Sequence, residues 1–160
     1  MDKVRPDNIQ FLAVRDLPFA PEFLWALLLD RTAHPEQNIS HQKMPSMKEH
    51  LEFVVAHPYR VWNIITYAGQ WVGVVSLTYR NEIGIQIHKD YRRQGLARAA
   101  LHRLMQQHTP ATPEPSLLPG HFVANIAPKN AASIALFTGL GAELIQVTYR
   151  LPGEGGVTSG

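Results

Sequence analysis

Hydrophobic and polar positions in the first third of the chain follow an extended spacing and then a helical one. Residues 9–14 (IQFLAV) are apolar enough to predict a first strand. Pro21 precedes EFLWALLLD, whose leucine and aromatic residues recur at helical spacing, so we predict a helix that starts at this proline. Residues 31–45 show no period and predict a loop. The series S-M-K-E at 46–49 has the form of a capping box and predicts a second helix, which ends before Pro58.

The spacing becomes extended again at residue 61. Runs rich in β-branched and aromatic residues cover residues 61–67, 71–79 and 82–88. The connections between these runs are short enough for antiparallel hairpins, so we predict a three-stranded meander. Residues 95–108 are rich in alanine, leucine and arginine and place their leucines on one stripe, which predicts a helix.

The last part of the chain predicts a strand, a short helix and a strand, over residues 121–127, 130–141 and 142–151. The whole order is then β-αα-βββ-α-β-α-β. This order predicts an α/β (α+β) fold of three layers, with a mostly antiparallel central sheet and helices on both faces. We expect a single domain over residues 1–151, followed by a flexible tail over 152–160.

Composition limits the class of protein. The chain has 160 residues, of which 45% are hydrophobic and 18% charged, so we expect one globular domain and not a disordered tail. No apolar run approaches the roughly 18 residues that a membrane span needs, and the N-terminus is charged, so we expect a cytoplasmic protein without a membrane partner. The absence of cysteine excludes disulfides, thiolate metal sites and a cysteine nucleophile. The eight histidines lack the paired spacing of metal ligands, so we expect no metal.

Positive charge is concentrated in one segment. The net charge is +2, yet residues 88–113 hold five cations against the single anion Asp90, a local balance of +4. The remainder of the chain therefore sums to −2. An anionic ligand is expected to bind in this segment, although the small total charge makes a nucleic-acid-binding protein only a weak alternative.

Residues 82–98 (EIGIQIHKDYRRQGLAR) combine a strand, a basic turn, a glycine and the start of a helix. A helix N-terminus offers unpaired N–H groups and a partial positive charge, and Gly95 allows a phosphate to approach the backbone. The segment therefore suits a pyrophosphate. It lacks both G-x-G-x-x-G and G-x-x-x-x-G-K-[ST], which disfavours the dinucleotide-binding Rossmann fold and the Walker phosphate loop.

Two sequence landmarks carry a resemblance to a known family. The run R-R-Q-G-L-A at 92–97 fits the pattern [RQ]-x-x-G-x-[GA] that follows a strand in the GNAT superfamily of acyl-CoA-dependent N-acyltransferases. The second landmark is Asn130, which opens a short helix that ends in an LGA turn. Both landmarks stand in the family's order and element context, so the chain resembles this superfamily over residues 9–151.

The resemblance implies acetyl-CoA as co-substrate and no metal. The strand at 82–88 would pair with the pantetheine arm as if the cofactor were an extra strand, in a V-shaped gap beside the strand that starts at His121. The Ile87 N–H would polarise the thioester carbonyl, and Asn130 would bind the pantetheine. The cofactor-binding residues implied in this way are Ile85, Gln86, Ile87, Arg92, Arg93, Gln94, Gly95, Leu96, Ala97, Arg98, Asn130, Ser133 and Phe137.

The resemblance also implies catalytic groups, with two departures from the family. Glu82 lies ten residues before Arg92, where one branch of the family keeps its catalytic glutamate, and is the candidate general base. Other members place a glutamate where this chain has Asn125 and a tyrosine acid where it has Phe137. The leaving thiolate could take its proton from the intermediate or from water, or Tyr79 or Tyr149 could act as the acid. These alternatives stay open.

The expected function is transfer of an acetyl group from acetyl-CoA to a primary amine by direct attack in a ternary complex. The alternative is a catalytically silent CoA-binding module of the same fold, which the two departures motivate. The acceptor could be a small molecule or a peptide, because family members share the cofactor half and differ in the acceptor half. Residues 31–45 either shape the acceptor pocket or simply connect two helices. The acyl group could be longer than acetyl, and a homodimer is possible by analogy with the family.

Overall fold

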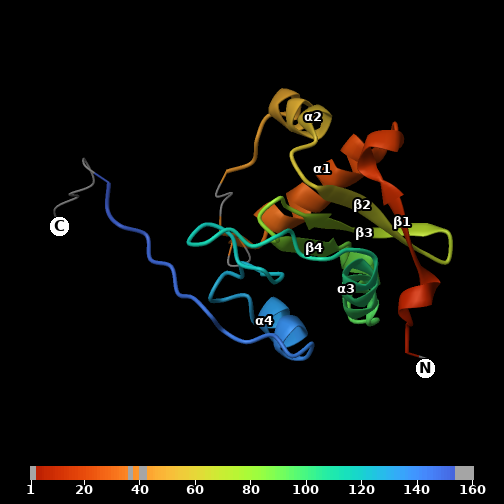
Figure 1. Ribbon diagram of the computed structural model, residues 1–160. Helices are drawn as coiled ribbons and strands as arrows, with labels where there is room; N and C mark the ends of the chain where they lie inside the picture. Colours follow the sequence, from red (N-terminus) through yellow and green to blue (C-terminus); the bar gives the residue numbers. More distant parts are fainter. Residues whose placement is uncertain (1–2, 36–37, 40–42, 154–160) are drawn as a thin grey trace.

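The computed structural model describes residues 3–35, 38–39 and 43–153. In these residues the strands β1 (Ile9–Ala13), β2 (Val61–Tyr67), β3 (Gln70–Leu77) and β4 (Ile83–Ile87) form one antiparallel sheet in the order β1-β2-β3-β4 (Figure 1). The helices are α1 (Ala20–Thr32), α2 (Met47–Ala56), α3 (Leu96–Gln107) and α4 (Ala131–Thr138), with 3-10 turns at Pro6–Asn8, Val14–Asp16 and Lys89–Tyr91.

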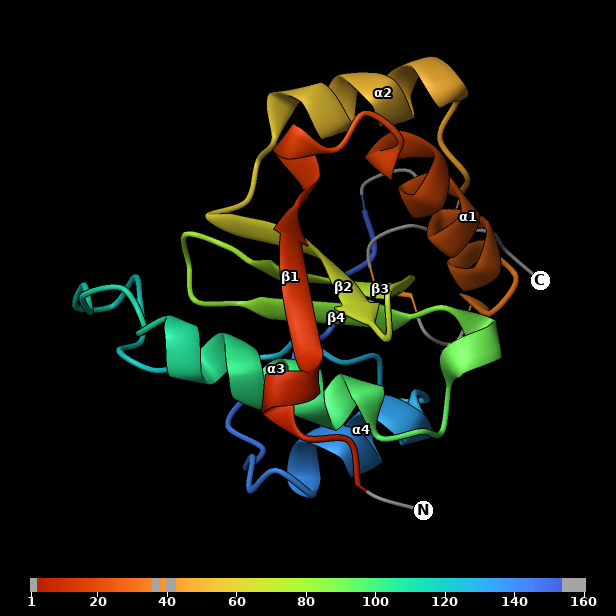
Figure 2. The ribbon, with the colours of Figure 1, turned by 90° about the vertical axis from the view of Figure 1, so that its right-hand side faces the viewer.

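The helices cover both faces of the sheet, as the element order predicts. Figure 2 shows α1 and α2 on one face and α3 with α4 on the other. The core under α1 joins Leu24 of this helix to Trp62 and Ile64 of β2. The core on the opposite face joins Leu101 and Leu104 of α3 to buried residues of all four strands. The predicted three-layer α+β architecture is therefore confirmed for the helices and the first four strands.

The helix starts are set by the local signals expected from the sequence. In the capping box that opens α2, the Glu49 N–H donates to Ser46 Oγ at 3.2 Å, and the Ser46 N–H donates to the Glu49 carboxylate at 2.7 Å. These hydrogen bonds hold the pKa of Glu49 below its ordinary value. Pro21 lies in the first turn of α1, where its missing N–H costs no helical hydrogen bond.

The last two predicted strands are wrong. Residues 121–127 form only one parallel bridge, between Val123 and Glu82, and residues 143–153 form no backbone hydrogen bond with any other described residue. A strand needs a paired neighbour, and the described residues beyond Val123 make no further bridge to β4. The described segment after α4 therefore has no partner edge. Its alternating apolar side chains are exposed, with Leu144 at 87% and Tyr149 at 82%. In Figure 1 this segment runs away from the sheet.

Gly73 allows β3 and β4 to approach closely. A Cβ atom at this position would lie 2.3 Å from the Gln86 carbonyl oxygen and 2.9 Å from Ile87 Cδ1. Gly73 pairs with Ile87 in the sheet, so any larger side chain would push β4 away from β3. The glycine thus fixes the position of the strand that carries the candidate site.

We predict that Gly73→Ala lowers the free energy of unfolding by about 1–3 kcal/mol, because the added methyl group overpacks the β3–β4 contact. Urea denaturation followed by circular dichroism measures this change. Gly153→Ala is the control, since a Cβ atom there has no neighbour within 4 Å and should leave the midpoint unchanged. Equal midpoints for both variants and the parent protein would contradict the close approach of the two strands.

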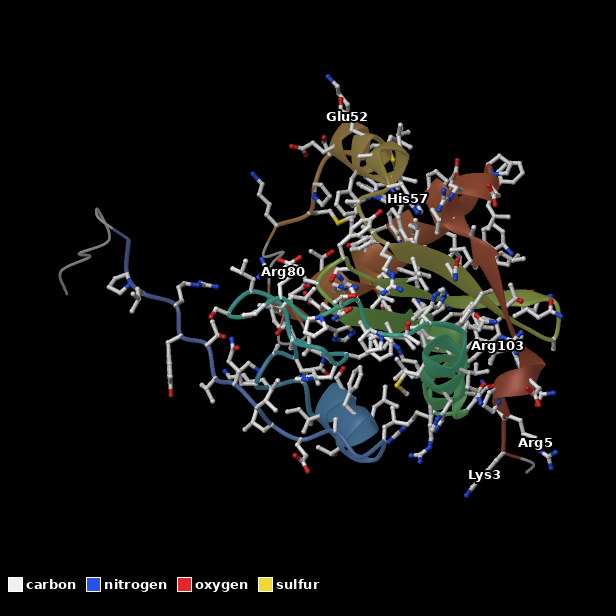
Figure 3. All side chains as sticks on the ribbon, viewed as in Figure 1. Lys3, Arg5, Glu52, His57, Arg80 and Arg103 are labelled. Carbon is white, nitrogen blue, oxygen red and sulfur yellow. The ribbon has the colours of Figure 1, made fainter. Side chains whose placement is uncertain are left out.

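His57 ends α2 in a left-handed conformation, with φ of 44°. Its ring lies 5.7 Å from the Trp62 ring, beneath a helix whose Glu52 points away to solvent (Figure 3). Both ring nitrogens are buried and have no hydrogen-bond partner in the described part of the chain. Burial and, to a smaller extent, the Arg15 charge lower the pKa of His57, while Asp16 opposes them. The folded protein therefore favours the neutral form of this imidazole over the protonated form.

We predict that protonation of His57 destabilises the fold as the pH falls. The unfolded chain binds the proton near its ordinary pKa of about 6.5, whereas the folded chain binds it only at lower pH, so stability is lost below about pH 6.5. His57→Asn keeps a residue that tolerates the left-handed conformation and removes the titrating group. Denaturation at pH 7 and pH 5 should show a smaller loss of stability for this variant. An equal loss in the two proteins would contradict the prediction.

Candidate functional site

One edge of β4 presents unpaired backbone groups. The His88 N–H donates to the Val72 carbonyl at 2.9 Å, so the alternation of an antiparallel pair directs the N–H groups of Gly84 and Gln86 toward β3 as well. The N–H groups of the intervening residues point to the opposite edge. Ile83 confirms this direction, because its N–H donates to the Val123 carbonyl at 2.8 Å.

The pairing along this edge stops almost at once. Val123 returns one hydrogen bond to the Asn81 carbonyl at 2.9 Å, and the described residues after it make no backbone hydrogen bond to β4. The N–H groups of Ile85 and Ile87 are therefore left without an acceptor in the described part of the chain. The break in pairing expected between residues 82–88 and 121–127 is present at this point.

The loop after β4 leads to a second set of free donors. Arg93 and Gly95 both adopt left-handed conformations, with φ of 61° and 79°. The first backbone hydrogen bond of α3 runs from the Ala99 N–H to the Gly95 carbonyl at 3.1 Å. No described residue accepts a hydrogen bond from the backbone amides between Arg93 and Arg98. This helix N-terminus thus has the unpaired amides and partial positive charge that bind an anion.

The three arginines of this loop have different surroundings. Arg92 forms an ion pair with Asp30 of α1 and donates its Nε–H to the Ile87 carbonyl at 3.2 Å. Arg98 donates to the Gly139 carbonyl at 3.0 Å and so connects α3 to the end of α4. Only Arg93 of the three has an exposed side chain that makes no hydrogen bond or ion pair with a described residue. The side chains of Arg92 and Arg98, expected at the phosphates, are instead engaged within the protein.

Gln86 connects β4 to the helix above it. Its side-chain amide donates to the Leu27 carbonyl of α1 at 2.7 Å, while its backbone faces β3. Both backbone groups of Gln86 therefore face β3, so of the three residues 85–87 implied in cofactor binding, Gln86 has no backbone group at the open edge. Together with the Arg92–Asp30 ion pair, this hydrogen bond holds the second half of α1 over β4.

Glu82 lies half-buried at the start of β4, and its N–H donates to Thr78 Oγ1 at 3.1 Å. Tyr59 and Arg31 were not among the residues predicted for the site. Tyr59 interacts electrostatically with Arg31 and with Glu82. Burial raises the pKa of Tyr59, the Arg31 charge opposes this shift, and Glu82 adds to it. Burial also lowers the pKa of Arg31. No local sequence pattern marks Tyr59 or Arg31, because the electrostatic interactions of Tyr59 with Arg31 and with Glu82 join distant segments of the chain.

The second landmark forms the start of α4. Asn130 Oδ1 accepts the Ser133 N–H at 3.1 Å and caps the helix, and its Nδ2 has no partner among the described residues. Phe137 packs against the core on the α3 face. The two candidate acids, Tyr79 and Tyr149, are 67% and 82% exposed, and neither forms a hydrogen bond with Glu82.

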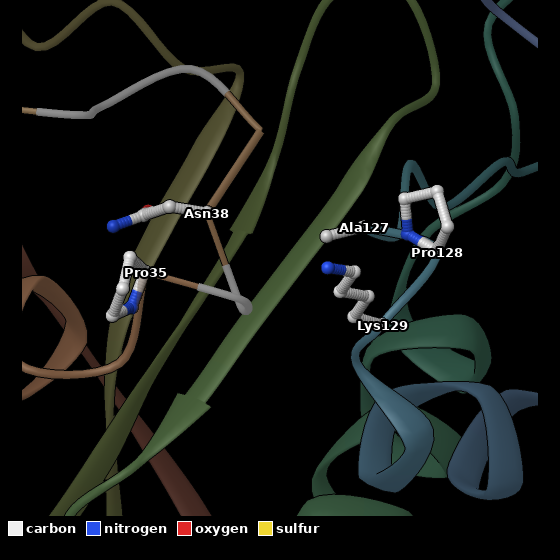
Figure 4. A pocket seen from close by; sticks show the side chains of 5 residues that line it. All are labelled: Pro35, Asn38, Ala127, Pro128 and Lys129. Atoms are coloured by element: carbon white, nitrogen blue, oxygen red, sulfur yellow. The ribbon is translucent and has the colours of Figure 1, made fainter.

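A cavity of about 480 Å³ lies between the loop after α1 and the segment before α4. Figure 4 shows its lining, which is formed by Pro35, Asn38, Ala127, Pro128 and Lys129. Pro35 and Asn38 are the described residues of the 31–45 loop that line this cavity, and residues 36–37 and 40–42 of the loop lie outside the described part. Asn38 is held by a hydrogen bond from its Nδ2 to the Arg31 carbonyl at 3.4 Å.

The described residues contain neither a metal-binding cluster nor a membrane-spanning helix. No cluster of three or more histidine, aspartate or glutamate side chains is arranged to hold a metal ion there. No helix in the same residues is both long enough and apolar enough to span a membrane.

The fold is similar to those of several solved acetyltransferases. RimL, a ribosomal L7/L12 alpha-N-protein acetyltransferase solved with coenzyme A, has a TM-score of 0.62 and 19% identity, over 82% of this chain and 78% of that one. The microcin C7 self-immunity acetyltransferase MccE, solved with acetyl-CoA and AMP, has a TM-score of 0.58 and 18% identity, over 84% and 78%. A ribosomal-protein-alanine N-acetyltransferase from Brucella melitensis has a TM-score of 0.58 and 20% identity, over 83% and 82%. At these identities the likeness concerns the fold.

A comparison with curated protein sequences gave no match. The family model described as an acetyltransferase (GNAT) domain matches residues 20–143, which extend from the start of α1 to just beyond α4. This range includes the open edge of β4 and the free amides at the start of α3. The chain therefore belongs to the GNAT family of acetyltransferases.

Proposed function

We propose that this protein transfers an acetyl group from acetyl-CoA to a primary amine by direct attack in a ternary complex. One observation carries the proposal. The free N–H groups of Ile85 and Ile87 at the edge of β4 are followed in the chain by the free amides between Arg93 and Arg98. A ligand with an amide-containing arm and a diphosphate matches both sets of donors.

Each part of coenzyme A has a proposed partner. The pantetheine arm lies beside β4 and accepts hydrogen bonds from Ile85, in the manner of an added strand. The diphosphate accepts from the amides at the start of α3, with the exposed Arg93 side chain as the nearest free cation of the loop. Asn130 donates its unpaired Nδ2–H to the arm.

Arg93→Glu is expected to weaken acetyl-CoA binding about tenfold or more, because hydrogen bonds and charges on an anion contribute about 1.5–3 kcal/mol each. Calorimetry with acetyl-CoA measures the change. Arg150→Glu makes the same charge reversal at an exposed residue in the segment after α4 and should leave the affinity unchanged. If both variants bound acetyl-CoA like the parent protein, the diphosphate would not lie at the start of α3.

The acetyl transfer needs an oxyanion donor and a route for one proton. The amine nitrogen bonds to the thioester carbon, the C–S bond breaks, and the proton lost by nitrogen is balanced by protonation of the leaving thiolate. The Ile87 N–H donates to the carbonyl oxygen as negative charge develops on it. The absence of cysteine supports direct attack over a covalent thioester of the enzyme.

Glu82 is the proposed general base, acting directly or through one water. An alkyl ammonium has a pKa of about 10.4 and must lose a proton before it attacks. The leaving thiolate is proposed to take its proton from the intermediate or from water, because the pKa of a thiol lies below that of the amine. Tyr79 and Tyr149 remain the alternatives for this role.

Glu82→Gln is predicted to lower kcat at neutral pH about 100-fold, with little change in the affinity for acetyl-CoA. The deficit should narrow as the pH approaches 10, because more of the acceptor amine is then already neutral. Glu52→Gln, at an exposed position on α2, is the control and should keep the activity of the parent protein. A deficit that stayed constant with pH would reject Glu82 as the base.

The silent CoA-binding module remains the second candidate, because Asn125 and Phe137 stand where relatives often carry catalytic groups. A panel of chemically diverse amines distinguishes the two. An acetyltransferase releases CoA thiol with at least one amine, whereas the silent module binds acetyl-CoA and releases thiol with none.

A further inference from the structure

We infer that Asn81 is a positioning residue for the proposed acetyl transfer, and that its buried side chain holds the backbone around Glu82 where pairing along β4 stops. The inference rests on the proposed function, because it explains how the candidate base is kept in place. It follows from the conformation, the burial and the hydrogen bonds of Asn81.

Asn81 occupies a turn position that glycine usually takes. It lies between β3 and β4 in a left-handed conformation with φ of 64°, and its N–H donates to the Thr78 carbonyl at 3.2 Å. Glycine adopts this conformation most easily, and asparagine tolerates it. Asn81 is also completely buried, with an exposed fraction of 0%. A buried amide group costs free energy unless it is hydrogen-bonded, so this side chain needs partners inside the protein.

The partners of the Asn81 side chain lie at the two ends of the loop that follows α3. Its Oδ1 accepts the Ala111 N–H at 2.6 Å. Its Nδ2 donates to the Pro119 carbonyl at 2.8 Å and to the Ala111 carbonyl at 3.4 Å. Figure 2 shows this loop at the same end of the sheet as the turn between β3 and β4. One side chain thus binds both ends of the loop and satisfies its own donor and acceptor groups.

Asn81 also holds the chain where it crosses the edge of β4. Shortly after Pro119, the chain reaches Val123, which forms the bridge to Glu82. In this bridge the Val123 N–H donates to the Asn81 carbonyl at 2.9 Å, and the Ile83 N–H donates to the Val123 carbonyl at 2.8 Å. Glu82 therefore lies between the two residues whose backbone groups bind Val123. The crossing chain is held at two points, by the side chain of Asn81 and by its carbonyl.

These contacts set where the open edge of β4 begins. Beyond the bridge, the N–H groups of Ile85 and Ile87 have no acceptor in the described part of the chain. Glu82 lies half-buried at this boundary. Without the Asn81 side chain, the loop loses hydrogen bonds at both ends, and the crossing chain can move relative to Glu82. The donors proposed for acetyl-CoA lie on β4 and at the start of α3, which the core holds, so cofactor binding should persist.

Asn81→Gly removes the side-chain hydrogen bonds and keeps a residue that adopts the left-handed conformation. We expect kcat to fall about tenfold, because a small displacement of a catalytic group is costly, with little change in the calorimetric affinity for acetyl-CoA. Ser116→Gly is the matched control, since Ser116 lies in the same loop with the same φ of 64° and an exposed side chain. This variant should behave like the parent protein.

A double-mutant cycle with Glu82→Gln separates positioning from a purely structural role. If Asn81 acts through Glu82, Asn81→Gly should lower kcat by less than about twofold in the Glu82→Gln background, because the two effects are coupled. A further loss of about tenfold in that background would show independent effects and overturn the inference. An Asn81→Gly variant that did not fold would overturn it too, since the side chain would then serve the stability of the whole domain.

Amide exchange measured by NMR without ligand tests the hydrogen bonds themselves and needs no activity. In the parent protein, the backbone amides of Ile83 and Val123 and the side-chain amide of Asn81 should exchange slowly. Fast exchange of the Asn81 side chain would overturn the inference without any variant. Asn81→Gly should speed exchange at Ile83 and Val123, whereas Ser116→Gly should not.

The same measurement separates this inference from a failure of the proposed function. If no amine is acetylated, or if Glu82→Gln keeps the activity of the parent protein, the proposed reaction or its base fails. Faster exchange at Ile83 and Val123 in Asn81→Gly then still supports Asn81 as the residue that holds the crossing chain. Equal exchange in Asn81→Gly and the parent protein rejects that role.

Discussion

The candidate site depends on the loss of strand pairing along one edge of β4. A single bridge, between Glu82 and Val123, joins the segment at 121–127 to this strand, and the residues from Val123 to residue 153 make no further bridge to it. A continuous pairing would have consumed the N–H groups of Ile85 and Ile87 in the sheet. These N–H groups are unpaired in the described part of the chain, and together with the free amides at the start of α3 they give this edge donors that a ligand can use.

The rest of the fold holds that edge in place. On one face, the Gln86–Leu27 hydrogen bond and the Arg92–Asp30 ion pair fix α1 above β4. On the other face, leucines of α3 pack under the same strand, so the start of this helix lies next to the strand's end. Because residue 73 is glycine, β3 packs closely against β4 on the side opposite the open edge. The two donor sets are thus held by the core of the protein and not by a free loop.

The sequence predicted correctly those elements whose ends carry a capping, proline or turn signal. The capping box at Ser46, the proline start of α1 and the hairpins of the meander all appear as expected. The strands at 121–127 and 142–151 were predicted from their residue types, but a strand also requires a partner edge, which no local pattern supplies. In the site, the glycine and free amides of the loop were predictable from the motif. Other features depend on contacts between distant segments, which no local pattern encodes. These are the ion pair of Arg92 with Asp30, the interactions of Tyr59 with Arg31 and Glu82, and the position of Lys129 beside a cavity.

Backbone amide exchange measured by NMR, with and without coenzyme A, tests the central claim most directly because it reports on individual donors. Addition of coenzyme A should slow exchange and shift the amide signals of Ile85, Ile87 and the residues between Arg93 and Arg98. The amides of Gln86 and His88, already paired with β3, should change little in protection. Protection that appeared elsewhere, or none at millimolar coenzyme A, would contradict the assignment of this edge as the cofactor site.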